Sequence, residues 1–496
     1  MKTTNILSIT ALVLALCACN KISDVPQPAA DNEIIITATL APKSPVTKAV
    51  SDQGTTIKVD WAQNEHIAIL YSIGSTKYMA DAEITSVDGS TGEATITFSV
   101  NGSTPDNTAC SIVYPFSAAK ADYSGVKAYA DLLSEQDGTL NADLDVRVGA
   151  GNIRTATPKL EVTTQPAAQF AIFKLTFGFC PLVLTVKSAG AVVTTVSPSA
   201  ATSATQSLYF ALPPTASGTA YEFTAFDNTN KYTKSVSSTS DINSGYFYQA
   251  TLSWTTTALT SFNLGSITEN TVVPDGARLS GTINANVKVS VAPGATVVLD
   301  NATIIGTNDS SYKWAGITCE DDATIVLSGT NTLKGFYDYP GISISKDKTL
   351  VIQGTGSLNA SSSGWAAGIG GAYGTHCGTI VIEGGTINAV GGDYSAGIGG
   401  AQGGTCNGII ITDGVTSVTA TKGPNAVNPI GAGGGTGSPS TCGTIVFGGV
   451  TMSEFPGYPK TSWIETPTSG ATYGGLTLTV STTTSADDTW TLVPGM

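Results

Sequence analysis

The stretch Thr379-Ile380-Val381-Ile382-Glu383-Gly384-Gly385 decides the fold of the C-terminal half of the chain. It is one of six copies of the same pattern, a short aliphatic strand that begins with Thr or Gly and runs into a glycine-containing turn. The copies recur every 25 to 36 residues, a period typical of solenoid proteins. Their strands are Thr296-Val297-Val298-Leu299, Thr324-Ile325-Val326-Leu327, Thr349-Leu350-Val351-Ile352, Thr379-Ile380-Val381-Ile382, Gly408-Ile409-Ile410-Ile411 and Thr444-Ile445-Val446-Phe447.

A second phrase keeps step with the first, so each coil holds at least two strands. Within the first phrase, alternate residues such as Ile380 and Ile382 share one face of a strand. One coil cannot bury that face alone, but coils stacked about 4.8 Å apart bury it between neighbours. The pattern predicts a right-handed parallel β-helix. The second phrase reads Ala315-Gly316-Ile317, Pro340-Gly341-Ile342, Ala367-Gly368-Ile369, Ala396-Gly397-Ile398 and Pro429-Ile430-Gly431.

The composition indicates an all-β protein of two or three domains. The 496 residues exceed what one core usually supports, only 12% are charged, and no segment shows sustained helical amphipathicity. A net charge of −14 with only Arg147, Arg154 and Arg278 lacks the basic surface that nucleic acid requires. We therefore expect no nucleic-acid partner.

The N-terminus has the pattern of a bacterial lipoprotein signal peptide over residues 1–19. Lys2 precedes an apolar run that is too short to span a bilayer, and the run ends at Leu16-Cys17-Ala18-Cys19. Cleavage before Cys19 would leave this cysteine as the lipidated (acylated) N-terminus, followed by a polar tether over residues 20–30. The alternative is a plain secretory signal.

From Ile34 to Trp254 the pattern changes to short alternating strands without a fixed period, which suggests β-sandwiches. The order of several motifs in this part resembles the fimbrillin family, fimbria subunits and relatives that anaerobic Gram-negative bacteria carry as lipoproteins. The resemblance covers about residues 31–258. The motifs are Val46-Thr47-Lys48-Ala49, Trp61 with Ile67-Ala68-Ile69, Tyr114-Pro115-Phe116, Gln136-Asp137-Gly138-Thr139-Leu140, Phe173-Lys174-Leu175-Thr176-Phe177, Tyr209-Phe210-Ala211-Leu212-Pro213 and Gly245-Tyr246-Phe247-Tyr248.

The resemblance implies two tandem transthyretin-like β-sandwiches, over residues 31–165 and 166–258, on the outer-membrane surface. Many family members assemble by strand donation, in which a protease removes the first strand and a neighbour's strand fills the groove. Lys43 and Lys48 occupy the region that the family often has cleaved, although neither is Arg. Unlike stalk subunits, this chain continues into the solenoid of residues 259–496, which favours a tip or accessory position. The alternative is a surface lipoprotein that does not polymerise.

Aromatic residues precede the second phrase in successive coils, and stacking is expected to bring them into a column. Aromatic faces along a rigid β surface suit the binding of sugar rings; the alternative is that the rings only stack on each other. The six candidate glycan-binding residues are Tyr312, Trp314, Tyr337, Tyr339, Trp365 and Tyr394.

Cys377, Cys406 and Cys442 each fall two or three residues before a repeated strand, so we expect them at one corner of successive coils. They are spaced either for a ladder of buried thiols or for a disulfide. His376 beside them invites a metal site, but one His with stacked thiols is a poor ligand set, and no metal is expected.

Glu320-Asp321-Asp322 is the densest acidic cluster of the solenoid. Clustered carboxylates with a basic residue would suit a polysaccharide lyase, and a carboxylate pair would suit a hydrolase. The cluster occupies a single coil, which favours a solvated turn. We therefore expect adhesion or fimbrial assembly as the function, without catalysis or cofactor. A surface polysaccharide lyase or hydrolase that uses the β-helix groove is the alternative.

Overall fold

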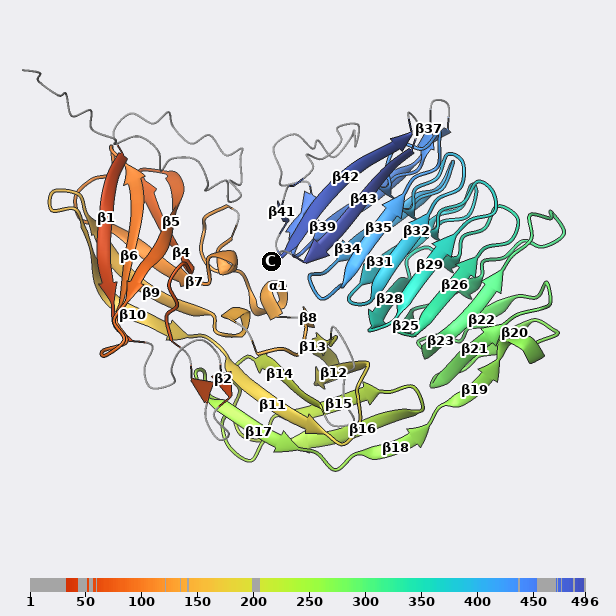
Figure 1. The fold of residues 1–496 in the computed structure, drawn as a ribbon, viewed down its shortest axis with the longest axis horizontal. Helices are drawn as coiled ribbons and strands as arrows, with labels where there is room; N and C mark the ends of the chain where they lie inside the picture. Colours follow the sequence, from red (N-terminus) through yellow and green to blue (C-terminus); the bar gives the residue numbers. More distant parts are fainter. Residues whose placement is uncertain are drawn as a thin grey trace, which may run out of the picture.

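The structure is a computed structural model that describes residues 33–42, 51–52, 57–58, 60–120, 122–133, 135–140, 142–198, 206–435, 438–452, 470, 472–473, 475–484 and 487–494. This part of the chain is all-β, as predicted, and its strands form a closed barrel, several small sheets and a large, mostly parallel sheet (Figure 1). No helix in it is long and apolar enough to cross a membrane. The helical segments are α1 (Tyr129–Leu133), η1 (Phe116–Ala118), η2 (Ala142–Leu144) and η3 (Leu264–Ser266).

The first module is a closed seven-stranded barrel, where the family resemblance implied a transthyretin-like β-sandwich. Closure depends on β1, which pairs antiparallel with β6 along its whole length and parallel with β10 through Thr37 and Lys159. Strand alternation reports which face is buried, but not whether two sheet edges meet, so the sequence could not distinguish the two arrangements. The strands are β1 (Glu33–Leu40), β4 (His66–Ile73), β5 (Thr76–Val87), β6 (Ala94–Asn101), β7 (Thr108–Tyr114), β9 (Arg147–Arg154) and β10 (Lys159–Ala168). A short separate pair consists of β2 (Ser51–Asp52) and β3 (Ile57–Lys58).

The second module packs two sheets on one core, and one of them includes β8, from the range predicted for the first module. Leu175 and Phe210 from one sheet and Val186 and Ala225 from the other belong to the same buried cluster. The three-stranded sheet has β14 (Gln206–Leu212), β11 (Ala171–Phe177) and β17 (Phe247–Thr251). The six-stranded sheet has β18 (Thr255–Ala258), β16 (Asn230–Ser237), β15 (Ala220–Phe226), β12 (Val183–Ser188), β13 (Ala191–Val196) and β8 (Glu135–Gln136).

The C-terminal part consists of stacked coils with three parallel ladders around one core, so each coil has three strands where the sequence required at least two. The repeated aliphatic phrase forms the first ladder, with β21 (Ala277–Thr282), β23 (Thr296–Ile305), β25 (Ala323–Ser328), β28 (Thr349–Gly354), β31 (Cys377–Ile382), β34 (Thr405–Ile411) and β39 (Thr441–Phe447). β23 also opens the second ladder, with β26 (Thr330–Lys334), β29 (Ser357–Ser361), β32 (Thr386–Val390) and β35 (Ser417–Thr421). The Gly-Ile phrase falls in the third, with β20 (Thr271–Val273), β22 (Val289–Val291), β24 (Ile317–Cys319), β27 (Ile342–Ile344), β30 (Ile369–Gly370), β33 (Ile398–Gly399) and β36 (Ile430–Gly431).

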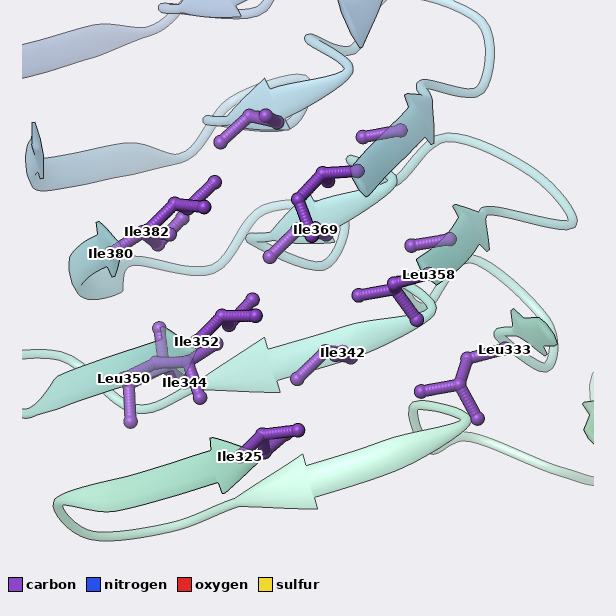
Figure 2. Packing of buried hydrophobic residues seen from close by; sticks show 14 of the residues in the cluster. Ile325, Leu333, Ile342, Ile344, Leu350, Ile352, Leu358, Ile369, Ile380 and Ile382 are labelled. Atoms are coloured by element: carbon purple, nitrogen blue, oxygen red, sulfur yellow. The ribbon is translucent and has the colours of Figure 1, made fainter. Parts of the chain in front are cut away.

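The predicted stacking of like residues is confirmed. Ile380 pairs with Leu350 below it and Ile409 above it, and all three side chains are fully buried. Figure 2 shows the inward aliphatic side chains of successive coils lying above one another. One register differs, because Ile325 pairs with Ile352 instead of Leu350. That shift is two residues, so the inward face stays inward.

The C-terminal end of the stack is covered by an antiparallel hairpin. Leu476–Val480 forms a capping strand as predicted, but its partner is β43, which also pairs with β35 of the second ladder. The predicted partner Trp463-Ile464 lies outside the described residues. The cap has β40 (Val450–Thr451), β41 (Thr472–Tyr473), β42 (Leu476–Thr484) and β43 (Asp487–Pro494), and two short strands, β37 (Gly434–Gly435) and β38 (Ser438–Pro439), pair beside it.

The stacked coils are joined to the second module by an apolar contact. Val298 on β23 and Val326 on β25 point outward from the coils, yet both are fully buried. They share a cluster with Leu182, Val183, Phe226 and Leu259 of the second module and the connecting segment. β19 (Thr260–Asn263) then continues from this contact into the first ladder through β21. The second module therefore packs against the outward side of the first ladder.

Candidate functional site: an aromatic patch on the stacked coils

The predicted glycan-binding residues all lie in loops that leave the strands of the second ladder. These loops span residues 306–316, 335–341, 362–368 and 391–397, one in each of four successive coils. Their stacking follows from the ladder, because Ile305, Lys334, Ser361 and Val390 end four strands in register. The loops are close to one another, but the rings do not all meet.

Tyr312 and Trp314 pack onto the core instead of a free surface. The Trp314 ring lies 5.5 Å from the Tyr312 ring and 5.4 Å from the ring of Phe336, which is fully buried. The indole N–H of Trp314 is also buried and has no hydrogen-bond partner in the described structure. Both residues are partly buried and pack against the core of the coils, so they do not form an exposed aromatic surface.

Trp365 is different, because its ring is 43% exposed and lies beside a second exposed ring. Tyr373 is 47% exposed, and the two rings meet edge to face with centroids 5.3 Å apart. Tyr373 comes from the next turn of the same coil. The two turns are adjacent because the intervening strand β30 has only two residues. Sequence reasoning missed Tyr373 because it follows the Gly-Ile phrase, whereas the other candidates precede it.

Asp338, in the preceding coil, accepts hydrogen bonds from the backbone of both aromatic residues. Its carboxylate Oδ1 accepts the backbone N–H of Trp365 at 2.9 Å, and its backbone oxygen accepts the N–H of Tyr373 at 3.2 Å. Gly364 allows this approach, since a Cβ there would lie 2.1 Å from Asp338 Oδ1. We call Asp338, Trp365 and Tyr373 the aromatic patch. It presents two apolar ring faces beside a carboxylate.

The other three predicted tyrosines do not extend the patch into a column. Tyr337 and Tyr339 flank Asp338 and are half-buried, and Tyr394 is half-buried with a φ of 59°. Within the described ranges, no ring contact joins these three tyrosines to another aromatic ring. The predicted column is thus not formed: Tyr312 and Trp314 pair on the core, and Trp365 pairs with Tyr373, which was not predicted.

The acidic cluster of residues 320–322 is neutralised by lysines from neighbouring coils. Glu320 forms an ion pair with Lys288, and Lys348 Nζ lies 2.5 Å from Asp321 Oδ1. The hydrogen bond from Lys348 lowers the pKa of Asp321. Asp322 Oδ1 accepts the N–H of Thr349 at 2.7 Å. The cluster therefore links three successive coils through ion pairs and a hydrogen bond.

The predicted corner of cysteines is present, with Cys377, Cys406 and Cys442 in register on three successive strands. All three are free thiols, which corresponds to the thiol ladder and not to the disulfide. His376 Nδ1 lies 2.6 Å from Thr405 Oγ1. Among the described residues, no group of three or more His, Cys, Asp or Glu is placed to hold a metal ion. Cys19, Lys43 and Lys48 lie outside the described residues.

Comparison with known proteins identifies no family for this chain. No family model matches the sequence. No curated protein matches it either. Among solved structures, the chain resembles a fimbrial assembly protein from Parabacteroides distasonis, with 11% sequence identity over 44% of this chain and 92% of that chain. The TM-score is 0.26, and a likeness of that size decides neither fold nor function.

Proposed function

We propose that this chain is a lipid-anchored protein of the outer-membrane surface that acts in adhesion as a fimbrial tip or accessory subunit. Cys19 carries the lipid. The modules of residues 31–165 and 166–258 form a fimbrillin-type stalk, and residues 259–496 form a right-handed parallel β-helix that binds glycans. The exposed Trp365–Tyr373 pair beside Asp338 is the observation that carries the proposal.

The chemistry of the patch suits a sugar. The C–H faces of a pyranose pack against aromatic rings, while a carboxylate accepts hydrogen bonds from its hydroxyls. The acidic cluster supports adhesion over a polysaccharide lyase or hydrolase, because Glu320 and Asp321 are each held by a lysine. A catalytic carboxylate would need to face the substrate.

The glycan site is tested by screening the full chain on a glycan array and measuring affinities for the glycans that bind. Trp365→Ala should weaken binding at least tenfold, since an aromatic contact and its buried area contribute more than about 1.4 kcal/mol. Tyr246→Ala is the matched control, because Tyr246 is 60% exposed on the second module, away from the patch. Wild-type affinity in Trp365→Ala would contradict the proposal.

Strand donation is the proposed route to assembly with other fimbrial subunits. Lys43 and Lys48 follow β1 in the sequence, so a cut at either lysine separates β1 from the rest of the barrel. Loss of β1 would expose the edges of β6 and β10, which β1 pairs with in the intact chain. The groove left behind would accept a strand from a neighbour.

A lysine-specific protease therefore should convert the chain to a form that multimerises, as measured by light scattering. The Lys43→Gln, Lys48→Gln double variant should remain uncut at this segment and monomeric. Cleaved wild-type chain that stays monomeric would count against strand donation and in favour of a surface lipoprotein that does not polymerise.

A further inference from the structure

Cys377, Cys406 and Cys442 form a ladder of three thiols at one corner of the stacked coils. The register pairs Cys377 with Cys406 and Cys406 with Cys442. Cys377 and Cys406 are 0% and 3% exposed, whereas Cys442, in the last coil, is half-buried. The middle thiol thus has two equivalent neighbours, and the outermost one is nearest to solvent.

The spacing between neighbouring strands determines which of the cysteines can form a disulfide. Neighbouring parallel strands lie about 4.8 Å apart, inside the Cα separation of roughly 4.4–6.8 Å found in disulfides. The Cβ atoms of stacked residues share that spacing, a few tenths of an ångström beyond the usual range. The cysteines stand at the first or second residue of β31, β34 and β39, where a strand can close by that amount. Cys377 and Cys442 are two rungs, or about 9.6 Å, apart and cannot be joined.

The contacts of the ladder favour reaction at the middle sulfur. Hydrogen bonds from the Cys377 and Cys442 thiols lower the pKa of Cys406, because they stabilise its thiolate. Cys319 provides a contrast on the third ladder. It pairs with Ile344 in the next coil, and burial raises its pKa to about 12.

We propose that the three cysteines are an oxidative modification site, at which a hydroperoxide produces one disulfide between Cys406 and either neighbour. The Cys406 thiolate attacks the peroxide oxygen and becomes a sulfenic acid, while the peroxide is reduced, to water in the case of hydrogen peroxide. The Cys442 sulfur then attacks the Cys406 sulfur, which forms the Cys406–Cys442 disulfide and releases the sulfenic oxygen, with the proton of the Cys442 thiol, as a second water. The Cys377 thiol can displace Cys442 by exchange, moving the bond down one rung. Either bond links two coils covalently.

The test treats the full chain with hydrogen peroxide under native conditions, then denatures it, alkylates the remaining thiols and maps the peptides by mass spectrometry. We expect one disulfide per chain, always containing Cys406, with the third ladder thiol and Cys319 alkylated. Cys377→Ser and Cys442→Ser should each keep the single disulfide that remains possible.

Cys406→Ser is the decisive variant, since it should form no disulfide between Cys377 and Cys442. Cys406→Ala repeats the test with a second side chain, and far-UV circular dichroism confirms that the coils are folded. A Cys377–Cys442 disulfide in either variant would overturn the proposal. So would a peroxide-treated wild-type chain in which all three ladder thiols are alkylated, or one in which Cys406 becomes a sulfinic acid instead of a disulfide.

Discussion

Replacing Ile380 by aspartate is expected to unfold the stacked coils. Ile380 is fully buried between Leu350 and Ile409, so a carboxylate there has aliphatic side chains above and below it. Burying a charge without a partner costs about 5 kcal/mol or more. This cost is comparable to the whole free energy of unfolding of many domains. Because each coil contacts only its neighbours, failure of one rung also separates the coils on either side.

The matched control for Ile380→Asp is Asn388→Asp, which introduces the same charge in the same coil. Asn388 lies on the outward side of β32 and is exposed, so its replacement removes only an exposed hydrogen bond to Asn359 Oδ1 and should change stability by at most about 1 kcal/mol. Thermal unfolding followed by far-UV circular dichroism measures both variants. If Ile380→Asp melts cooperatively at the wild-type temperature, position 380 does not face the core and the coil register is wrong.

Replacing Asp145 by alanine is expected to destabilise the first module by about 3–5 kcal/mol. Asp145 Oδ2 lies 2.8 Å from Arg147 Nε, and their side chains are only 3% and 5% exposed. The guanidinium of Arg147 cannot lose its charge, so removal of the carboxylate leaves that charge buried without its partner. Arg147 begins β9, which pairs with β7 on one side and β10 on the other, so the loss should reach the whole module.

Glu161→Ala provides the exposed counterpart. Glu161 lies 3.2 Å from Arg154 Nη1, and their side chains are 50% and 34% exposed, so its loss should cost at most about 1 kcal/mol. Urea unfolding can be followed by tryptophan fluorescence, to which Trp61, 3% exposed in the barrel core and against Tyr114, contributes together with the other five tryptophans of the chain. Equal midpoints for the two variants would show that the buried pair contributes no more than a surface pair.

The stacked coils could be predicted from the sequence because the repeat period and the strand alternation both indicate that the same residues face the core. Ile380 and Ile382 recur at a solenoid period and share a strand face, and both face the core. The barrel was missed because its closure depends on the pairing of Thr37 with Lys159, far away in the chain. The alternation of residues in a strand indicates which side chains are buried, but not which other strand it pairs with. The closure of a barrel by distant strands therefore leaves no local signal in the sequence.

The candidate site was predicted only in part, because repetition identifies equivalent positions but not which of them are exposed. Repetition placed Trp365 in a loop at the rim of the coils, and that ring is exposed. It also selected Trp314, whose ring covers Phe336, since two Trp residues before a Gly-Ile phrase look alike in sequence. Tyr373 reaches Trp365 only because β30 is two residues long, and strand length at a corner depends on packing.

The most direct test of adhesion by the aromatic patch is titration of the full chain with a glycan that binds on the array, with product analysis of the recovered glycan. The proposal predicts saturable binding that Trp365→Ala weakens at least tenfold, with the glycan recovered at its original length. Recovery of shortened or unsaturated chains would contradict it in favour of a polysaccharide-cleaving enzyme. Equal affinity of wild type and Trp365→Ala would place the binding site elsewhere.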